Sequence, residues 1–270
     1  MRHSYFRRHA KILARYGIVK LKEITEYKLD LVMSTVGLSS WFLAMFFYWR
    51  LILGDQTTLA GWTLPELFLL PLFGQLIFAI LGIFWGGIHN LWRDVTDGTF
   101  DKHLARPVNP LVGQIANYMG MWGFIRVSLI LMIMLGVIIA YPSQVSILSV
   151  LLAFLVSIMG VLVYTAIVVL LHLSAFWIGD NRFLDDATAA IERWMIYPLN
   201  LFPKGMRVFF TYIFPIMFIT VFPVKILFNQ VSWHHILYIL GALGLLLSIW
   251  TILLIALWRK ALGRYESGGG

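Results

Sequence analysis

The stretch VSLILMIMLGVIIAYPSQVSILSVLLAFLVSIMGVLVYTAIVVLLHLSAFWIG decides the fold. It runs from Val127 to Gly179 and contains no Asp, Glu, Lys or Arg. The residues Tyr141 to Gln144, with their Pro and Ser, predict a turn that divides it in two. Each half is long enough to cross the hydrocarbon core of a bilayer, about 30 Å thick, as a helix. The stretch therefore predicts two transmembrane helices joined by a very short loop.

Apolar segments on either side of this stretch extend the pattern to six predicted spans. Their approximate bounds are 31–51, 67–91, 111–140, 147–177, 208–224 and 236–258. The first turns of the third span carry Gln114, Asn117 and Tyr118, so we expect them to face water. Pro215 and Pro223 predict a kinked or broken fifth helix, which requires protein or water around its freed carbonyl groups.

The composition agrees with a membrane protein. Of the 270 residues, 60% are hydrophobic and 13% are charged, whereas soluble domains average about 25% charged residues. The mean hydropathy is +0.82. We predict an all-α membrane protein in which residues 1–270 form a single transmembrane domain. The chain has no cysteine, which excludes disulfides and thiolate metal sites.

Residues 4–28 precede the first span and predict an amphipathic helix. Basic residues cluster on one side, and Phe6, Leu13 and Ile24 fall together on another. A helix of this kind suits the headgroup region, so we expect it to lie along the membrane. No cleavable signal peptide is predicted, because the first long apolar run begins only after Asp30.

The distribution of basic residues predicts the orientation. Of the 21 Lys and Arg residues, 18 fall in residues 1–28, 93–110 and 180–207 and in the tail after Trp258. Because cytoplasmic segments are enriched in Lys and Arg, we expect both termini and both long loops to be cytoplasmic. Within 180–207, apolar residues at helical spacing predict a short amphipathic helix that ends at Pro198. The net charge of +8 is then explained by anionic headgroups, and no nucleic-acid partner is expected.

The segment RDVTDGTFDKHLARPVNP, residues 93–110, joins the second and third spans. Asp97 and Gly98 predict a turn, Thr99 is a candidate N-cap, and Pro107 and Pro110 limit the helix at its other end. These features predict a short helix held across the membrane surface between two spans. An ordinary solvated loop is the alternative interpretation.

The run from Asp97 to Pro110 resembles the loop between the second and third spans of ABC-2-type ABC transporter permeases. More narrowly, it resembles that of viologen-exporter-like export permeases, a branch in which two different permeases are often found with one ATPase. The sequences of residues 174–177 and 197–199, and the two prolines of the fifth span, agree with this resemblance. Many relatives carry L-L-x-R-P where this chain has His103-Leu104-Ala105-Arg106-Pro107, a difference that concerns the contacts with the ATPase.

The resemblance implies the membrane-spanning subunit of an ATP-driven exporter in the bacterial cytoplasmic (inner) membrane. The implied partners are an ABC ATPase subunit in two copies, membrane lipids, and a second permease that is either a paralogue or a copy of this chain. The chain has no G-x-x-x-x-G-K-[ST] phosphate loop, so ATP and Mg²⁺ would bind the partner and no cofactor is expected here. Phe100 and Leu104 would fill an apolar groove on the ATPase. The implied coupling residues are Asp97, Gly98, Thr99, Phe100, Asp101, Lys102, Leu104, Arg106 and Pro107.

Two polar residues within predicted spans are candidates for a transport pathway. Gln75 either lines a path or bridges helices. Arg126 either contacts the pathway or headgroups, or snorkels to the cytoplasmic phosphates. His234 and His235 are adjacent, cannot share a helix face, and are not expected to bind a metal.

The alternative function is a membrane-embedded lipid-modifying enzyme. Such an enzyme needs an acid, a base or a nucleophile gathered at one depth, and the sequence shows neither a Ser-His pair, nor H-E-x-x-H, nor a carboxylate within a predicted span. A secondary transporter would be expected to carry intramembrane carboxylates and internal repeats. The exporter is therefore preferred, and its aromatic, nearly uncharged spans predict an amphipathic or lipid-like substrate.

Overall fold

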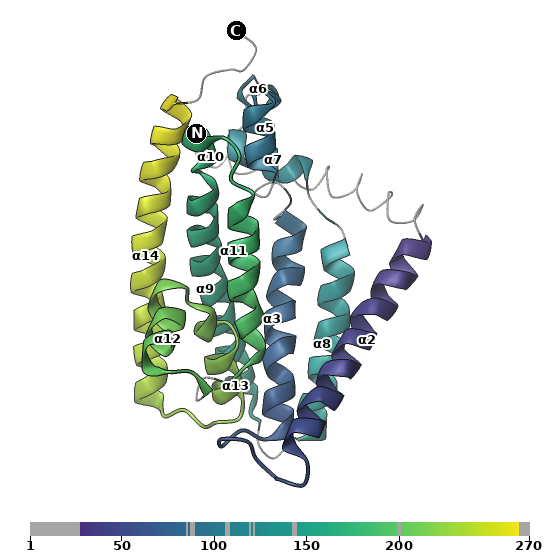
Figure 1. Cartoon of the computed structure of the whole chain (residues 1–270). Coiled ribbons are helices and arrows are strands. Elements are labelled where there is room, and N and C mark those ends of the chain that lie inside the picture. The colour runs from purple at the N-terminus through teal and green to yellow at the C-terminus, as the bar shows by residue number, and fades with distance from the viewer. Residues whose placement is uncertain are drawn as a thin grey trace.

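The computed structural model describes residues 28–84, 86, 90–105, 109–118, 120, 122–141, 145–198 and 201–264. Five long helices dominate this part of the chain (Figure 1) and are apolar enough to cross a membrane. They are α2 (Lys28–Leu53), α3 (Leu64–Phe84), α8 (Trp122–Ala140), α9 (Ile147–His172) and α14 (Trp233–Arg264). The predicted all-α membrane fold is confirmed.

Short helical segments lie at the ends of these long helices and between them. They are α5 (Leu91–Thr96), α6 (Asp101–Leu104), α7 (Pro110–Asn117), α10 (Ala175–Ile178), α11 (Phe183–Glu192), η2 (Arg193–Ile196), α12 (Lys204–Val208), η4 (Phe209–Ile213), η5 (Ile216–Phe218) and α13 (Val221–Leu227). We call the end of the bundle that holds α5, α6, α7 and α10 the upper end, and the opposite end the lower end (Figure 1). Helix α2 begins, and α14 finishes, toward the upper end.

Helices α3 and α9 form the interior of the bundle. In the apolar window of α3, 78% of the residues are buried, against 6% in that of α2. Helix α8 approaches α3 closely at Gly123, where an added Cβ would lie 2.5 Å from the carbonyl oxygen of Ala79. Small residues permit this kind of contact between membrane helices, where dispersion forces replace the hydrophobic effect. The outer faces of α2, α8 and α14 remain for lipid or for partner chains.

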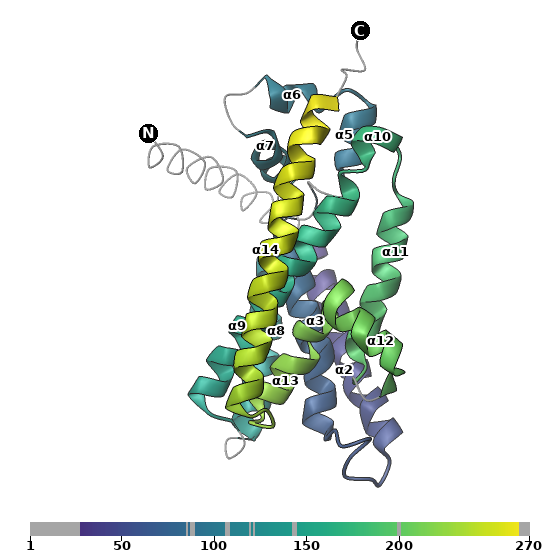
Figure 2. The same cartoon turned by 90° about the vertical axis from the view of Figure 1, so that its left-hand side faces the viewer.

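The segment 183–198 does not stay at the upper end, so the prediction that residues 180–207 form a surface loop is wrong. His172, at the upper end of α9, contacts Asp185 at 2.8 Å. Two helical turns lower, Tyr164 donates a hydrogen bond to Glu192. Tyr197 reaches Trp49, near the lower end of α2, with ring centroids 6.2 Å apart. Helix α11 and η2 therefore descend along the bundle as a further crossing (Figure 2).

The predicted fifth span, residues 208–224, is instead a sharply bent pair of short helices. The arms Lys204–Ile213 and Ile216–Leu227 meet at 77°, and both lie in the lower half of the bundle (Figure 2). Ser149, in the first turn of α9, donates a hydrogen bond to the carbonyl oxygen of Leu227. The predicted break at Pro215 is confirmed, but it produces a re-entrant hairpin that returns to the lower end, and α11 supplies the crossing.

Two further span limits differ from the prediction. Helix α8 begins at Trp122, not near residue 111, because α7 is a separate helix. The amide of Gly120 donates to the carbonyl oxygen of Ile83 at 2.9 Å, so the chain bonds to the upper end of α3 instead of continuing one helix. Helix α3 itself ends at Phe84. The predicted surface helix at residues 4–28 lies outside the described residues, apart from Lys28.

Candidate functional site: the element between α3 and α8

The predicted short helix between the second and third spans is present as α6. Gly98, with φ of 69°, makes the turn that reverses the chain after α5, a conformation that favours glycine. Phe100 is the N-cap of α6, so the prediction that Thr99 caps this helix is wrong. Helix α7 follows, and its first turn is capped by the Asn109 side chain, which accepts from the amide of Leu111. We call residues 91–105 and 109–118 the α5–α7 element.

A buried carboxylate holds this element together. Asp94 is 3% exposed. Its Oδ1 accepts hydrogen bonds from the hydroxyl groups of Thr99 and Tyr118, each at 2.9 Å. Its Oδ2 accepts from the Gln114 amide at 2.8 Å. Because the three donors come from the turn, from α7 and from its C-cap, one side chain fixes the relative positions of all three.

The same network acts on the phenol of Tyr118. Burial, followed by the hydrogen bond to Asp94, raises the pKa of Tyr118 to about 12. The neutral phenol is stabilised because only the protonated form can donate to the carboxylate. Gln114 and Tyr118, predicted from the sequence to face water, instead face Asp94. Their spacing of four residues in an otherwise apolar segment was the signal that could have indicated a shared polar partner.

Phe100 belongs to the bundle, so the prediction that it fills a groove on another protein is wrong. Its side chain is 0% exposed and packs with Leu91, Leu173, Phe176 and Ala261 in one cluster. The ring of Phe100 meets that of Phe176 edge-on, with centroids 5.6 Å apart. A four-residue helix has one side toward its own protein, and the aromatic side chain lies on that side. Phe100 therefore fastens α6 to α5, α9, α10 and α14.

The outward side of the element is small and mixed in character. Leu104 is 42% exposed, and Asp97, Thr99 and Lys102 are exposed around it, while Asp101 is half-buried. Arg106 and Pro107 lie outside the described residues. A partner protein at this end would meet one apolar side chain bordered by both signs of charge, which suits a docking rim better than a deep anchor.

The turn between α10 and α11 adds a second contact to the element. Arg182 lies over the ring of Trp92 in α5, 4.9 Å from its centroid, and pairs with Asp180 at 2.5 Å. The hydrogen bonds from Arg182 lower the pKa of the Asp180 carboxyl. Asn181 is buried and donates to the carbonyl oxygen of His172 at 3.0 Å. The start of the α11 crossing is therefore attached to α5 and to α9.

The two pathway candidates lie apart from this element. Gln75 is half-buried midway along α3, and Arg126 is exposed in the second turn of α8. The position of Arg126 close to the upper end of α8 is compatible with snorkelling. Their roles in transport stay predictions. The sequence predicted no carboxylate within a span. In the structure, α11 brings two carboxylates, those of Asp185 and Glu192, alongside α9.

A bundle of long apolar helices, with short helices between two of them at one end, is typical of a multi-pass membrane protein. The sequence comparison agrees: a family model described as ABC-2 family transporter protein matches residues 39–269. This chain belongs to that family and is an ABC-2-type transport permease subunit. No match was found among curated proteins or among solved structures.

Proposed function

We propose that this chain is the membrane-spanning subunit of an ATP-driven exporter, and that the α5–α7 element receives movement from a separate ABC ATPase. The carrying observation is the buried Asp94, which makes the element one rigid piece between α3 and α8. Displacing a rigid piece moves the helices on both of its sides together. ATP and Mg²⁺ would bind the ATPase, because this chain has no phosphate loop.

The proposed assembly contains two copies of the ATPase and a second permease, either a paralogue or a copy of this chain. It would lie in the bacterial inner membrane with both termini cytoplasmic, so that the upper end faces the ATP-hydrolysing subunits. The excess of Lys and Arg in the segments expected at that end supports this orientation. The loop motif supports the viologen-exporter-like branch.

The proposed substrate is amphipathic or lipid-like. The alternative function, a lipid-modifying enzyme, requires a reactive group that is accessible at one depth. The carboxylate of Glu192 is bound by the phenol of Tyr164, and Asp185 contacts His172. Both contacts join α11 to α9, which supports a structural role for these polar pairs and leaves transport as the preferred function.

The test is the association of this chain with a partner ABC ATPase, sought among the reading frames next to its own. Leu104→Ala removes the apolar side chain on the outward side of α6, and we expect co-purification to weaken about tenfold, since truncating an interface contact costs roughly 1–2 kcal/mol. Leu201→Ala is the matched control, because Leu201 is similarly exposed at 49% but lies outside the element. If Leu104→Ala retains wild-type association and wild-type stimulation of ATP hydrolysis, the α5–α7 element is not the docking site.

A further inference from the structure

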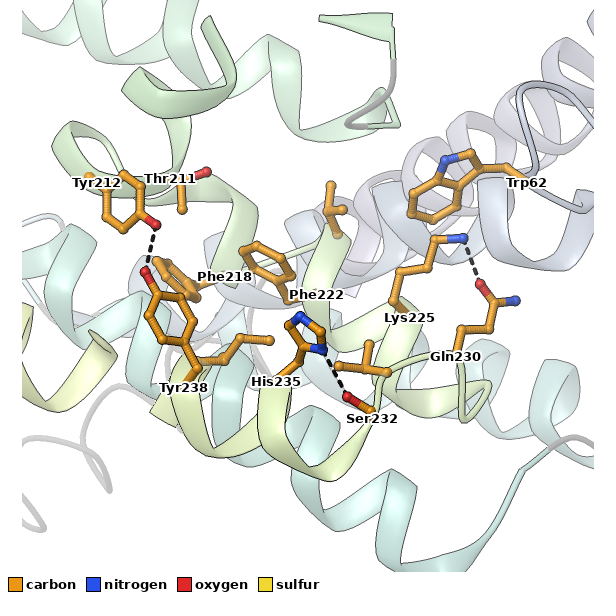
Figure 3. A pocket seen from close by; sticks show the side chains of 13 residues that line it. Trp62, Thr211, Tyr212, Phe218, Phe222, Lys225, Gln230, Ser232, His235 and Tyr238 are labelled. Atoms are coloured by element: carbon orange, nitrogen blue, oxygen red, sulfur yellow. Dashed lines mark hydrogen bonds between the residues drawn. The ribbon is translucent and has the colours of Figure 1, made fainter. Parts of the chain in front are cut away.

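A pocket lies at the lower end of the bundle, far from the α5–α7 element (Figure 3). Its volume is about 350 Å³, within the range of small-molecule sites. It opens between η4, α13 and the first turns of α14. The lining residues are Trp62, Thr211, Tyr212, Phe218, Val221, Phe222, Lys225, Gln230, Val231, Ser232, His235, Tyr238 and Ile239.

One end of this pocket is polar and cationic. The ammonium of Lys225 donates to Oε1 of Gln230 at 2.6 Å and lies 3.9 Å from the centroid of the Trp62 ring. Ser232 and His235 are hydrogen-bonded to each other at 2.8 Å on the neighbouring side (Figure 3). Lys225 lies in the last turn of α13 and His235 in the first turn of α14, and Gln230 and Ser232 lie in the connection between these helices at the lower end.

The counter-charge of Lys225 is buried and is not among the residues that line the pocket. Glu66 is 1% exposed, and its Oε1 lies 3.7 Å from the lysine Nζ. The carboxylate accepts from the amide of Thr63 at 2.6 Å and from the Gln230 amide at 2.5 Å. None of the described residues that line the pocket is acidic. An occupant therefore meets the ammonium of Lys225 and no acidic side chain among the lining residues, and this favours an anion.

Beyond these groups the wall of the pocket is apolar. Phe218 and Phe222 line this part, with ring centroids 5.1 Å apart, together with Ile239. On the far side of the two phenylalanines, the hydroxyl groups of Tyr212 and Tyr238 are hydrogen-bonded to each other at 3.0 Å (Figure 3). Ser232 and Ile239 are seven residues apart, which corresponds to about 10 Å along α14. Polar groups at the end of the bundle, followed by an apolar wall toward its middle, repeat the order of headgroup and chain in a lipid leaflet.

We propose that this pocket binds a lipid with an anionic headgroup from the leaflet at the lower end of the bundle. The headgroup would contact Lys225 and Ser232, and the start of an acyl chain would lie along Phe218 and Phe222. That this leaflet is the outer one rests on the orientation proposed above. The binding itself does not depend on the ATPase.

The test uses the full-length chain, purified in detergent micelles that contain either phosphatidylglycerol or phosphatidylcholine. Native mass spectrometry then counts the lipids that remain bound. We expect tighter retention of phosphatidylglycerol, and Lys225→Gln to weaken this retention at least about tenfold, since a hydrogen bond to a charged group contributes roughly 1.5–3 kcal/mol. Lys204→Gln, at an exposed lysine of α12 outside the pocket, should behave as wild type.

A second pair of variants guards against a folding defect. Lys225→Gln leaves Glu66 buried without its cation, whereas the double change Lys225→Gln with Glu66→Gln removes both charges. The double variant should fold and still lose the preference for phosphatidylglycerol, and Lys225→Arg should keep it. Equal retention of both lipids by the wild type, or displacement of phosphatidylglycerol by inorganic phosphate, would overturn the proposal. These outcomes leave ATPase association unchanged, so the two proposals fail separately.

Discussion

Asp94 shows how much of the α5–α7 element depends on one side chain. A buried carboxylate is costly unless its oxygens accept hydrogen bonds, and here three donors from separate segments provide them. The three donors also depend on Asp94. Without its carboxylate each of them would lose its present acceptor, and an unsatisfied polar group costs about 1–3 kcal/mol when it is buried. The element is therefore expected to move as a unit.

The pH dependence of stability should report on this network. The pKa of Tyr118 rises from about 10 in an unfolded chain to about 12 in the folded protein. A raised pKa stabilises the fold fully below pH 10, and this stabilisation is lost as the pH rises through 12. We expect Tyr118→Phe to lose stability at neutral pH but to show a smaller further loss between pH 10 and 12 than wild type. Thermal unfolding in detergent measures both, with Tyr141→Phe as an exposed control. Parallel pH curves for wild type and Tyr118→Phe would contradict the assignment.

Phe100→Ala should act on folding before it acts on any partner. The buried ring leaves a cavity among Leu91, Phe176 and Ala261, and truncating a buried Phe costs about 3–5 kcal/mol. We expect a lower unfolding temperature for the purified chain alone, with Leu104→Ala nearly unchanged in the same assay. An unfolding temperature equal to that of the wild type would indicate that Phe100 is not buried and lies on the outward surface of the element.

At the scale of elements, the sequence predicts the crossings that are uniformly apolar. The predicted spans 31–51 and 236–258 lie within α2 and α14, because long apolar runs such as these are stable as helices in lipid. Helix α11 could not be predicted as a crossing, since it carries Asp185, Asp186 and Glu192 within ten residues. Asp185 and Glu192 are paired with His172 and Tyr164 of α9, and such pairing is a property of the folded bundle that hydropathy does not record.

The descent of α11 and η2 can be tested by an engineered disulfide. A Cβ added at Gly74 would lie 3.4 Å from the Cβ of Met195, close to the spacing of about 3.5–4.5 Å found in disulfides. We expect Gly74→Cys with Met195→Cys to cross-link on mild oxidation. The chain has no native cysteine, so mass spectrometry of the digested protein identifies the bond without competing pairs.

The matched control for this cross-link is Gly74→Cys with Thr188→Cys. Thr188 lies two turns of helix above Met195, toward the upper end, and about 10 Å of rise separates them. No bond should form in this control. Failure of the Gly74–Met195 pair to cross-link, as in the control, would restore residues 180–207 to the membrane surface.

At the scale of the whole molecule, the candidate site is predictable in position but not in orientation. Turn and proline signals place a short helix between two spans, and α6 is found there. Which side of α6 faces outward depends on Leu173, Phe176 and Ala261, which are distant in sequence and meet Phe100 only in the assembled bundle. The lower pocket has the same origin, since Trp62, Lys225 and Tyr238 come from three separate elements. The local sequence pattern predicts the helix or turn in which each of these residues lies. Which of them come together in one site depends on how the helices pack.

The orientation of the bundle is the remaining prediction. The structure moves Lys204 and Arg207 to the lower half, which weakens the charge asymmetry. However, the segment with eight Lys and Arg residues that ends at Lys28 adjoins the start of α2, toward the upper end, and the positive-inside tendency still directs that end to the cytoplasm. We expect His234→Cys, at the exposed start of α14, to react with an impermeant thiol reagent in intact cells. Asp97→Cys, exposed on the α5–α7 element, should react only after permeabilisation, because an ABC ATPase can reach this element only from the cytoplasm. Labelling of Asp97→Cys from outside, with His234→Cys protected, would show that the upper end faces away from the cytoplasm. That orientation would rule out coupling through this element.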